Sequence, residues 1–180
     1  MTDSLDMWWW HLMIDHRNPF LTSIALIMNY SLDVIYLVFL GLIIYYAVKR
    51  QWHETTIFGV SFLIQQFIFL IGIKNIVRRQ RPPANDWLAK PSGYSFPSGH
   101  NVTTAALMMT CVLVYRKTWV KVMAGIVIVL MMWSRPYLGV HWLTDVVFGM
   151  LFGVASAYLA VFVANKFFTA DSSRLKKQIT

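Results

Sequence analysis

Five apolar runs follow one another along the chain, and each approaches the length of a membrane-spanning helix. A helix needs about 20 predominantly apolar residues to cross the hydrocarbon core of a bilayer. Runs two and five meet this length directly, whereas run three meets it only if its helix begins near Ser98. The pattern predicts an all-α integral membrane bundle of about five transmembrane helices, at residues 32–48, 55–73, 101–115, 118–134 and 146–164.

The N-terminal region has a different character, because a tryptophan cluster at positions 8–10 precedes the first run. Tryptophan prefers the level of the lipid headgroups, so residues 5–28 are predicted to form interfacial helices. The first span could extend upstream through residues 24–28, but three polar residues interrupt the apolar pattern there: Asn29, Ser31 and Asp33. A single domain is predicted over residues 1–168, followed by a polar cytoplasmic tail at 169–180.

Composition strengthens the membrane interpretation. Of the 180 residues, 57% are hydrophobic and only 13% are charged, against about 25% charged residues in an average soluble domain. The formal net charge of +8 indicates anionic partners. The basic residues cluster at the ends of the apolar runs, which is typical of membrane proteins and argues against nucleic-acid binding. The single cysteine, Cys111, excludes a disulfide framework within the chain.

Basic residues also predict the orientation of the bundle, since cytoplasmic loops are enriched in lysine and arginine. In a five-span arrangement, Lys49–Arg50, Arg116–Lys117 and the basic residues after run five share one side. That side is therefore predicted to be cytoplasmic, and the N-terminus with Asp3 and Asp6 lies outside. Five cations lie on the outer side and oppose this assignment: Lys74, Arg78, Arg79, Arg81 and Lys90. Either the topology is inverted, or a function holds these cations outside.

Three polar clusters fall at the outer ends of the predicted spans, although they are far apart in sequence. The first places Lys74 seven residues before Arg81–Pro82, and the second is the run Pro97-Ser98-Gly99-His100. The third is Ser134–Arg135, followed by His141 and Asp145. A five-span arrangement brings all three clusters to one face of the membrane.

The clusters contain what a metal-free phosphoryl transfer requires. Catalysis of that reaction is mostly positioning and electrostatic stabilisation of charge on the phosphoryl oxygens. Lys74, Arg81 and Arg135 are candidate cations, and arginine binds two phosphate oxygens at once. Ser98 and Gly99 open the third span, where free backbone N–H groups bind anions readily.

Two histidines complete the candidate chemistry. His141 and Asp145 are four residues apart and share one face of a helix, so the carboxylate can orient one ring nitrogen and activate the other. His100 can protonate the leaving oxygen and later activate water. Because the two histidines must hold opposite protonation states, a bell-shaped pH profile is predicted.

In this order and spacing, the three clusters resemble the signature of the type 2 phosphatidic acid phosphatase (PAP2) superfamily, over about half the chain, 74–145. The resemblance implies His141 as the nucleophile, Asp145 as its partner and His100 as the general acid. It implies that five residues bind phosphate: Lys74, Arg81, Ser98, Gly99 and Arg135. It also implies that no cofactor or metal is needed. Small bacterial membrane members usually have six spans and hydrolyse undecaprenyl diphosphate, phosphatidylglycerophosphate or related lipids.

Other interpretations remain open at the level of sequence. A lipid-dependent phosphotransferase would use the same groups with another acceptor, and a transporter or scramblase would use buried charges to line a pathway. Intact His100, His141 and Asp145 argue against a non-catalytic relative. Arg78 and Arg79 fall outside the motif and are interpreted as solvated interfacial charges.

Overall fold

The computed structural model describes the backbone of residues 4–179 and the side chains of residues 4–169, and it is built from helices. Asp3 and the basic side chains of the C-terminal tail lie outside the part described. The elements in chain order are α1 (Ser4–Asp15), α2 (Pro19–Val48), α3 (Trp52–Leu63), the π-helical stretch η1 (Ile64–Ile73), α4 (Lys74–Val77), the 3-10 turn η2 (Ala84–Asp86), α5 (Gly99–Tyr115), α6 (Thr118–Tyr137) and α7 (Leu143–Ile179).

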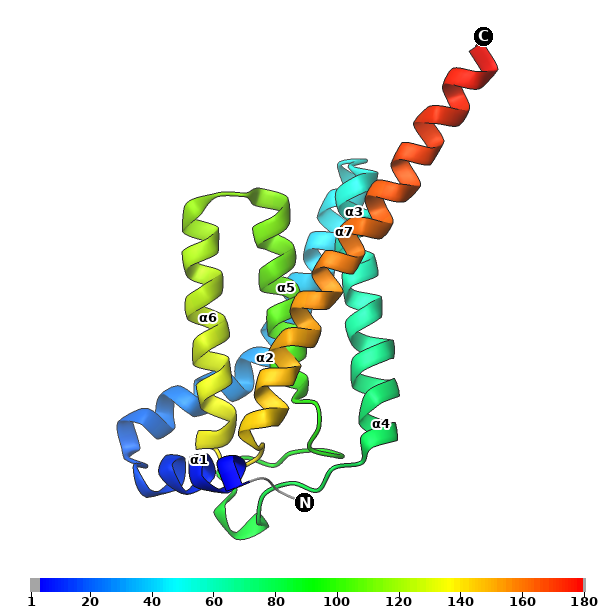
Figure 1. The fold of residues 1–180 in the computed structure, drawn as a ribbon. Coiled ribbons are helices and arrows are strands. Elements are labelled where there is room, and N and C mark those ends of the chain that lie inside the picture. Colours follow the sequence, from blue (N-terminus) through cyan, green and yellow to red (C-terminus); the bar gives the residue numbers. More distant parts are fainter. Residues whose placement is uncertain (1–3, 180) are drawn as a thin grey trace.

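Four helical segments of the described chain are long and apolar enough to cross a membrane, in agreement with the predicted class. They are Pro19–Val48, Trp52–Val77, Thr118–Tyr137 and Leu143–Thr169. The remaining predicted span, at residues 101–115, corresponds to α5, whose 17 residues are about 26 Å long at 1.5 Å per residue. It packs against α2, α3, α6 and α7 in the middle of the bundle (Figure 1).

The N-terminal prediction needs one correction. Residues 4–15 form the separate helix α1, but residues 19–28 belong to α2 and begin the first long apolar helix. Asn18 caps this helix by accepting a hydrogen bond from the backbone N–H of Leu21 at 2.9 Å. The polar residues at 29–33 do not end α2. The hydroxyl of Ser31 donates a hydrogen bond to the carbonyl of Met28, and the backbone polar groups are satisfied within the helix.

Apolar side chains cover both the interior and the outer surface of the bundle. Phe39, Phe58, Leu107 and Met131 are buried in one core cluster, whereas large apolar side chains such as Leu37, at 69% exposure, point outward. Outward apolar surface of this extent is costly in water and favourable in lipid. Polar groups inside the bundle are paired across helices, as in the 3.0 Å bond from Thr103 to Gln65.

Small residues allow α5 and α7 to pack closely. A Cβ atom on Gly149 would lie 2.9 Å from the carbonyl oxygen of Ser98, and one on Gly153 would lie 2.7 Å from the Cβ of Ala105. Neither position has room for a larger side chain, so the two glycines bring α7 directly against the first turns of α5. The packing places the start of α7 beside the start of α5.

All the predicted site clusters lie at one end of the bundle. The loop 78–98, helix α1 and the 138–142 turn meet there, while the α2–α3 and α5–α6 turns lie at the other end (Figure 1). The convergence predicted from the five-span arrangement is therefore present in the fold.

Candidate phosphate site

A cavity of about 160 Å³, here called the cationic cavity, lies where the three sequence clusters meet. Of the predicted site residues, six line it. They are Lys74, Arg81, Gly99, His100, Arg135 and His141, and the remaining lining residues are Asn29, Leu32, Lys90, Pro91 and Ser92. Four of these eleven side chains are cations and none is a carboxylate, so the cavity favours an anion with several oxygen atoms.

His141 is presented by a tight turn between α6 and α7. Gly139 in this turn has a φ of +76°, and a Cβ there would lie 2.5 Å from the carbonyl oxygen of Asp86. The turn is also tied to the loop 78–98, because Leu88 donates its backbone N–H to the carbonyl of Leu138 at 3.0 Å. A side chain at position 139 would collide with Asp86 and displace this loop. The left-handed backbone of this residue also favours glycine.

The surroundings of His141 determine which ring nitrogen faces the cavity. Nδ1 lies 3.6 Å from a carboxylate oxygen of Asp145 and 3.4 Å from the hydroxyl of Ser95. Nε2 lies 3.1 Å from a guanidinium nitrogen of Arg81, which is a donor only. Nδ1 is therefore assigned the proton, and the Nε2 lone pair faces the cationic cavity. Burial, together with the positive charges of Arg81 and Arg135, lowers the pKa of His141 to about 3, although Asp145 raises it.

Asp145 is fully buried and is held by several donors. One oxygen accepts hydrogen bonds from the Ser95 hydroxyl and from the backbone N–H of Trp142. The other accepts a 2.6 Å hydrogen bond from Arg79. These contacts fix the plane of the carboxylate and direct it at His141. The predicted pairing is present, but the two residues do not share a helix face, because His141 lies in the turn before α7.

Arg81 is anchored by backbone carbonyls on both sides of the cavity. It donates to the carbonyls of Gly93, Ser92 and Tyr94 in the loop and to that of Val140 at 2.6 Å. Burial lowers its pKa to about 10, with Asp145 opposing this effect, so the side chain remains a cation at neutral pH. It therefore both fixes the loop and places positive charge beside Nε2 of His141.

Asn29 of α2 contacts two further residues of the cavity, Arg135 and His100. Its side-chain oxygen accepts a 2.8 Å hydrogen bond from Arg135, and its backbone carbonyl lies 3.2 Å from Nε2 of His100. Arg135 is 2% exposed, and its Nε has no hydrogen-bond partner among the described residues. An anion in the cavity can satisfy such a buried donor.

Ser98 is the one predicted phosphate ligand that does not line the cavity. It is fully buried, and its hydroxyl accepts a 2.9 Å hydrogen bond from Asn101. Its backbone N–H donates to the carbonyl of Asp145 at 3.1 Å. In this structure Ser98 therefore joins α5 to α7, while Gly99 and His100 face the cavity.

Sequence reasoning missed four residues at the site, which are Asp6, Asn29, Arg79 and Ser95. The interpretation of Arg79 as a solvated charge is wrong, because its side chain is paired with two carboxylates. Its hydrogen bonds raise the pKa of Arg79, even though burial alone would lower it. The sequence did contain a signal for Arg79, because this residue lies between Lys74 and Arg81 of the first cluster. Asn29 was interpreted only as an interruption of the apolar run.

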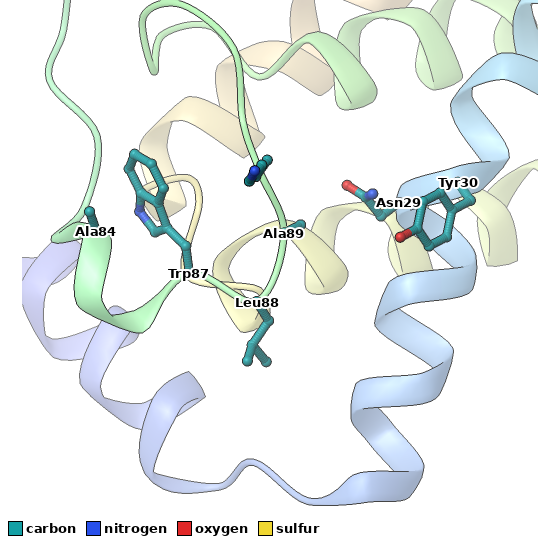
Figure 2. Close-up of a pocket in the computed structure, with 7 residues that line it drawn as sticks. Asn29, Tyr30, Ala84, Trp87, Leu88 and Ala89 are labelled. Atoms are coloured by element: carbon teal, nitrogen blue, oxygen red, sulfur yellow. The ribbon is translucent and has the colours of Figure 1, made fainter.

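A larger cavity of about 560 Å³, here called the loop cavity, adjoins the cationic cavity and shares Asn29 and Lys90 with it. Figure 2 shows Asn29 and Tyr30 on α2 facing Trp87 and Ala89 of the loop. Because Asn29 also contacts His100, the loop cavity adjoins the His100 side of the site.

Fold and site together define a polytopic membrane protein with a histidine and several cations arranged around one cavity. Comparison with known families makes this assignment specific. The sequence model of the PAP2 superfamily matches residues 54–168, and the chain belongs to that superfamily.

Characterised relatives match parts of the chain. The undecaprenyl-diphosphatase of Sulfolobus acidocaldarius is 40% identical over 72 residues, which cover 40% of this chain and 34% of that protein. Phosphatidylglycerophosphatase B of Bacillus subtilis is 29% identical over 143 residues, covering 73% of this chain and 66% of that protein. The chain thus spans from about a third to just under two thirds of the length of these relatives.

Two solved structures share the fold over most of their length. Aquifex aeolicus LpxE superposes with a TM-score of 0.72 at 22% identity, covering 88% of this chain and 96% of that one. The PAP2-type phosphatidylglycerolphosphate phosphatase from Bacillus subtilis superposes with a TM-score of 0.67 at 27% identity, covering 91% and 86%. The protein is therefore an integral membrane member of the PAP2 superfamily.

Proposed function

We propose that this protein hydrolyses a lipid phosphate or diphosphate through a phosphohistidine intermediate on His141. The observation that carries the proposal is the orientation of His141. Its Nε2 lone pair faces a cavity lined by cations, while its Nδ1 faces the buried carboxylate of Asp145. This arrangement supplies a neutral nucleophile, a fixed tautomer and positive charge where the phosphoryl oxygens must lie.

In the first step, Nε2 of His141 attacks phosphorus and the bond from phosphorus to the leaving oxygen breaks. His100 gives its proton to that oxygen, and Asp145 stabilises the positive charge that develops on the imidazole. In the second step, His100 takes a proton from water, the water oxygen attacks phosphorus and the nitrogen–phosphorus bond breaks. Lys74, Arg81 and Arg135, with the backbone at Gly99, hold the phosphoryl oxygens in both steps.

The direct test is phosphate release by the purified protein in detergent with excess chelator. Phosphatidic acid, phosphatidylglycerophosphate and undecaprenyl diphosphate form the substrate panel, and His141→Ala is the control. Release that survives chelation and disappears in a folded His141→Ala variant supports the mechanism. An active His141→Ala variant overturns the nucleophile assignment, and no release from any lipid by folded wild type overturns the phosphatase.

The finer proposal is a lipid with two phosphates, such as undecaprenyl diphosphate or phosphatidylglycerophosphate. In both lipids a second phosphate lies on the leaving side of the bond that breaks. The loop cavity adjoins the His100 side and shares Lys90 with the cationic cavity, so it offers room and a cation for that second group. The names of the two sequence relatives support the same pair of lipids.

Lys90 provides the test of this substrate class. A charge-assisted hydrogen bond is worth about 1.5 kcal/mol or more, so Lys90→Ala should lower kcat/KM for a two-phosphate lipid about tenfold. Phosphatidic acid, which has one phosphate, should lose much less activity. Lys117→Ala, at the opposite end of the bundle, is the matched control. Equal losses on both lipids would contradict the subsite.

We further propose that the site faces outward from a bacterial plasma membrane. Cations at the other end, at the α2–α3 and α5–α6 turns, are exposed: Lys49, Arg50, Arg116 and Lys117. At the site end Arg78 and Lys90 are exposed as well, but Arg81 and Arg135 belong to the cationic cavity and Arg79 is ion-paired. The larger set of exposed cations, at the α2–α3 and α5–α6 turns, is the one that the positive-inside rule places in the cytoplasm.

A further inference from the structure

Asp6 in the first turn of α1 is a buried carboxylate in a helix that sequence analysis placed at the membrane interface. Its exposure is 0%, and a buried charge is costly unless it is paired and hydrogen-bonded. It accepts hydrogen bonds from the backbone N–H of Thr144 at 2.9 Å and from the Thr144 hydroxyl at 2.8 Å. Asp6 therefore satisfies a free donor at the start of α7, in the turn that carries Asp145.

Arg79 connects Asp6 to Asp145. One terminal nitrogen of its guanidinium donates to Asp6, and the other donates to Asp145 and to the Thr144 hydroxyl, both at 2.6 Å. The planar guanidinium thus holds two carboxylates in fixed positions. Its carbon also lies 5.8 Å from the centre of the Trp142 ring, beside the turn that carries His141.

Charge balance gives this chain of contacts a consequence for the nucleophile. If Arg79 were paired with Asp145 alone, the guanidinium would offset the carboxylate charge that has to stabilise a positive imidazole. With Asp6 as a second partner, the three groups together carry one net negative charge. That charge remains available to His141 during phosphoryl transfer.

We propose that Asp6 and Arg79 are positioning residues of the catalytic site, and that α1 orients Asp145 and balances its charge. The inference rests on the proposed phosphatase function and adds to it a role for the N-terminal helix. Neither residue lines the cationic cavity, so both act through Asp145 and His141 rather than on the substrate.

The test compares Asp6→Asn and Arg79→Gln with two controls, Asp15→Asn on the exposed face of α1 and Arg78→Gln at the exposed neighbouring position. Loss of a group that orients a catalytic ligand typically costs about 10- to 100-fold in activity. We expect kcat to fall by this factor in both test variants, with KM nearly unchanged because the cavity cations remain. The controls should stay close to wild type. Size-exclusion profiles and melting temperatures identify variants that fail to fold.

The pH profile separates electrostatic positioning from a structural role. Asp6→Asn leaves Arg79 to offset Asp145, which lowers the proton affinity of His141, so the acid limb of kcat should move to lower pH. Arg79→Gln removes the cation and should move this limb to higher pH. Other charges that face His141 are unchanged in both variants: Arg81 and Lys74 from the segment 74–81, His100 from α5, Arg135 from α6 and Asp145 from α7. Arg79→Lys, which keeps the charge, should leave the limb near its wild-type position.

The proposal would be overturned if the acid limb of kcat moved in the same direction in Asp6→Asn and Arg79→Gln. It would also be overturned if these two variants were as active as the controls. Failure of the phosphatase function itself would be seen separately, as wild-type protein that releases no phosphate. In that case ¹⁵N NMR of His141 decides the proposal on its own. Asp6→Asn, which leaves Arg79 to offset Asp145, should reduce the fraction of the tautomer protonated at Nδ1, and an unchanged fraction would contradict the positioning role.

Discussion

At the residue scale, the site depends on how each group around His141 uses its hydrogen bonds. Asp145 faces Nδ1, and Arg81 contacts Nε2. Because Arg81 can only donate, Nε2 carries the lone pair, on the side of the ring where Arg81 lines the cationic cavity. A single buried imidazole is thereby given one tautomer and one direction for its lone pair.

Asp145→Asn tests this assignment of the tautomer. The amide fits the same space, but its NH₂ group can donate to Nδ1 and so favours the tautomer with the proton on Nε2. In a related arrangement of histidine and carboxylate, this change lowers kcat by about 10⁴-fold, and we expect a loss of about 10³- to 10⁴-fold here. Asp33→Asn, at an exposed position on α2, is the control. Activity within tenfold of wild type in Asp145→Asn would contradict the assignment.

Burial of His141 also predicts how stability depends on pH. Its pKa is lowered from 6.5 in the unfolded chain to about 3 in the fold. Between these values the unfolded chain binds a proton that the folded protein does not, so stability falls as the pH decreases through this window. His141→Gln lacks this effect. We therefore compare the melting temperature of wild type with that of His141→Gln in the same detergent. The wild-type value should decrease relative to the variant from pH 7 to pH 4. A constant difference in melting temperature would contradict the burial of a neutral imidazole.

At the element scale, the contact between α5 and α7 brings two motifs together that lie more than 30 positions apart in sequence. Ser98 at the start of α5 bonds the carbonyl of Asp145 in α7, and Gly149 lies directly against Ser98. Gly149 and Gly153 form a pair of small residues one turn apart on α7, and both pack against α5 within the monomer. The site is thus built on two helices that approach closely.

Gly153→Ala tests the importance of this contact. The added methyl group would meet the backbone of Val102 and the side chain of Ala105, and overpacking of this kind costs about 1–3 kcal/mol. We expect a lower melting temperature and a lower kcat, because α7 carries Asp145. Gly125→Ala on α6, where no atom lies within 4 Å of the added Cβ, is the matched control. Equal melting temperatures in the two variants would show that α5 and α7 do not need this close approach.

At the scale of the whole molecule, the bundle separates two ends of different chemistry. Helix α1 and the loop 78–98 occupy one end, and the α2–α3 and α5–α6 turns occupy the other (Figure 1). The cationic cavity lies at the first end, because Arg81 and Lys90 of the loop line it. An active site at a membrane surface allows the lipid chain to stay in the bilayer while the phosphate enters the cavity. The orientation decides from which side of the membrane substrate arrives.

Site-directed labelling in intact cells measures this orientation. In a Cys111→Ser background, we expect a membrane-impermeant maleimide to label Ser92→Cys, at the site end, without permeabilisation. Lys117→Cys, at the other end, should be labelled only after permeabilisation. The reverse pattern would show that the site faces the cytoplasm and that the inverted topology is correct.

The sequence by itself determined the class of fold and most of the charged groups of the site. Run length is enough to identify spans because lipid requires every backbone polar group to be satisfied within a helix. The spacing of four also predicted the pairing of His141 with Asp145, although His141 lies in the turn before α7 and not on a shared helix face. The ends of runs also located the three clusters on one face, which the fold confirms.

Tertiary structure alone decided which other side chains complete the site. Asn29 seemed to interrupt a span, Asp6 seemed to belong to an interfacial helix and Arg79 seemed to be solvated, yet all three are hydrogen-bonded at the site. Their partners lie between 66 and 106 positions away in sequence, so no local spacing relates them. A buried charge takes whichever partner the packing brings within reach, and that is a property of how the helices pack rather than of any single segment.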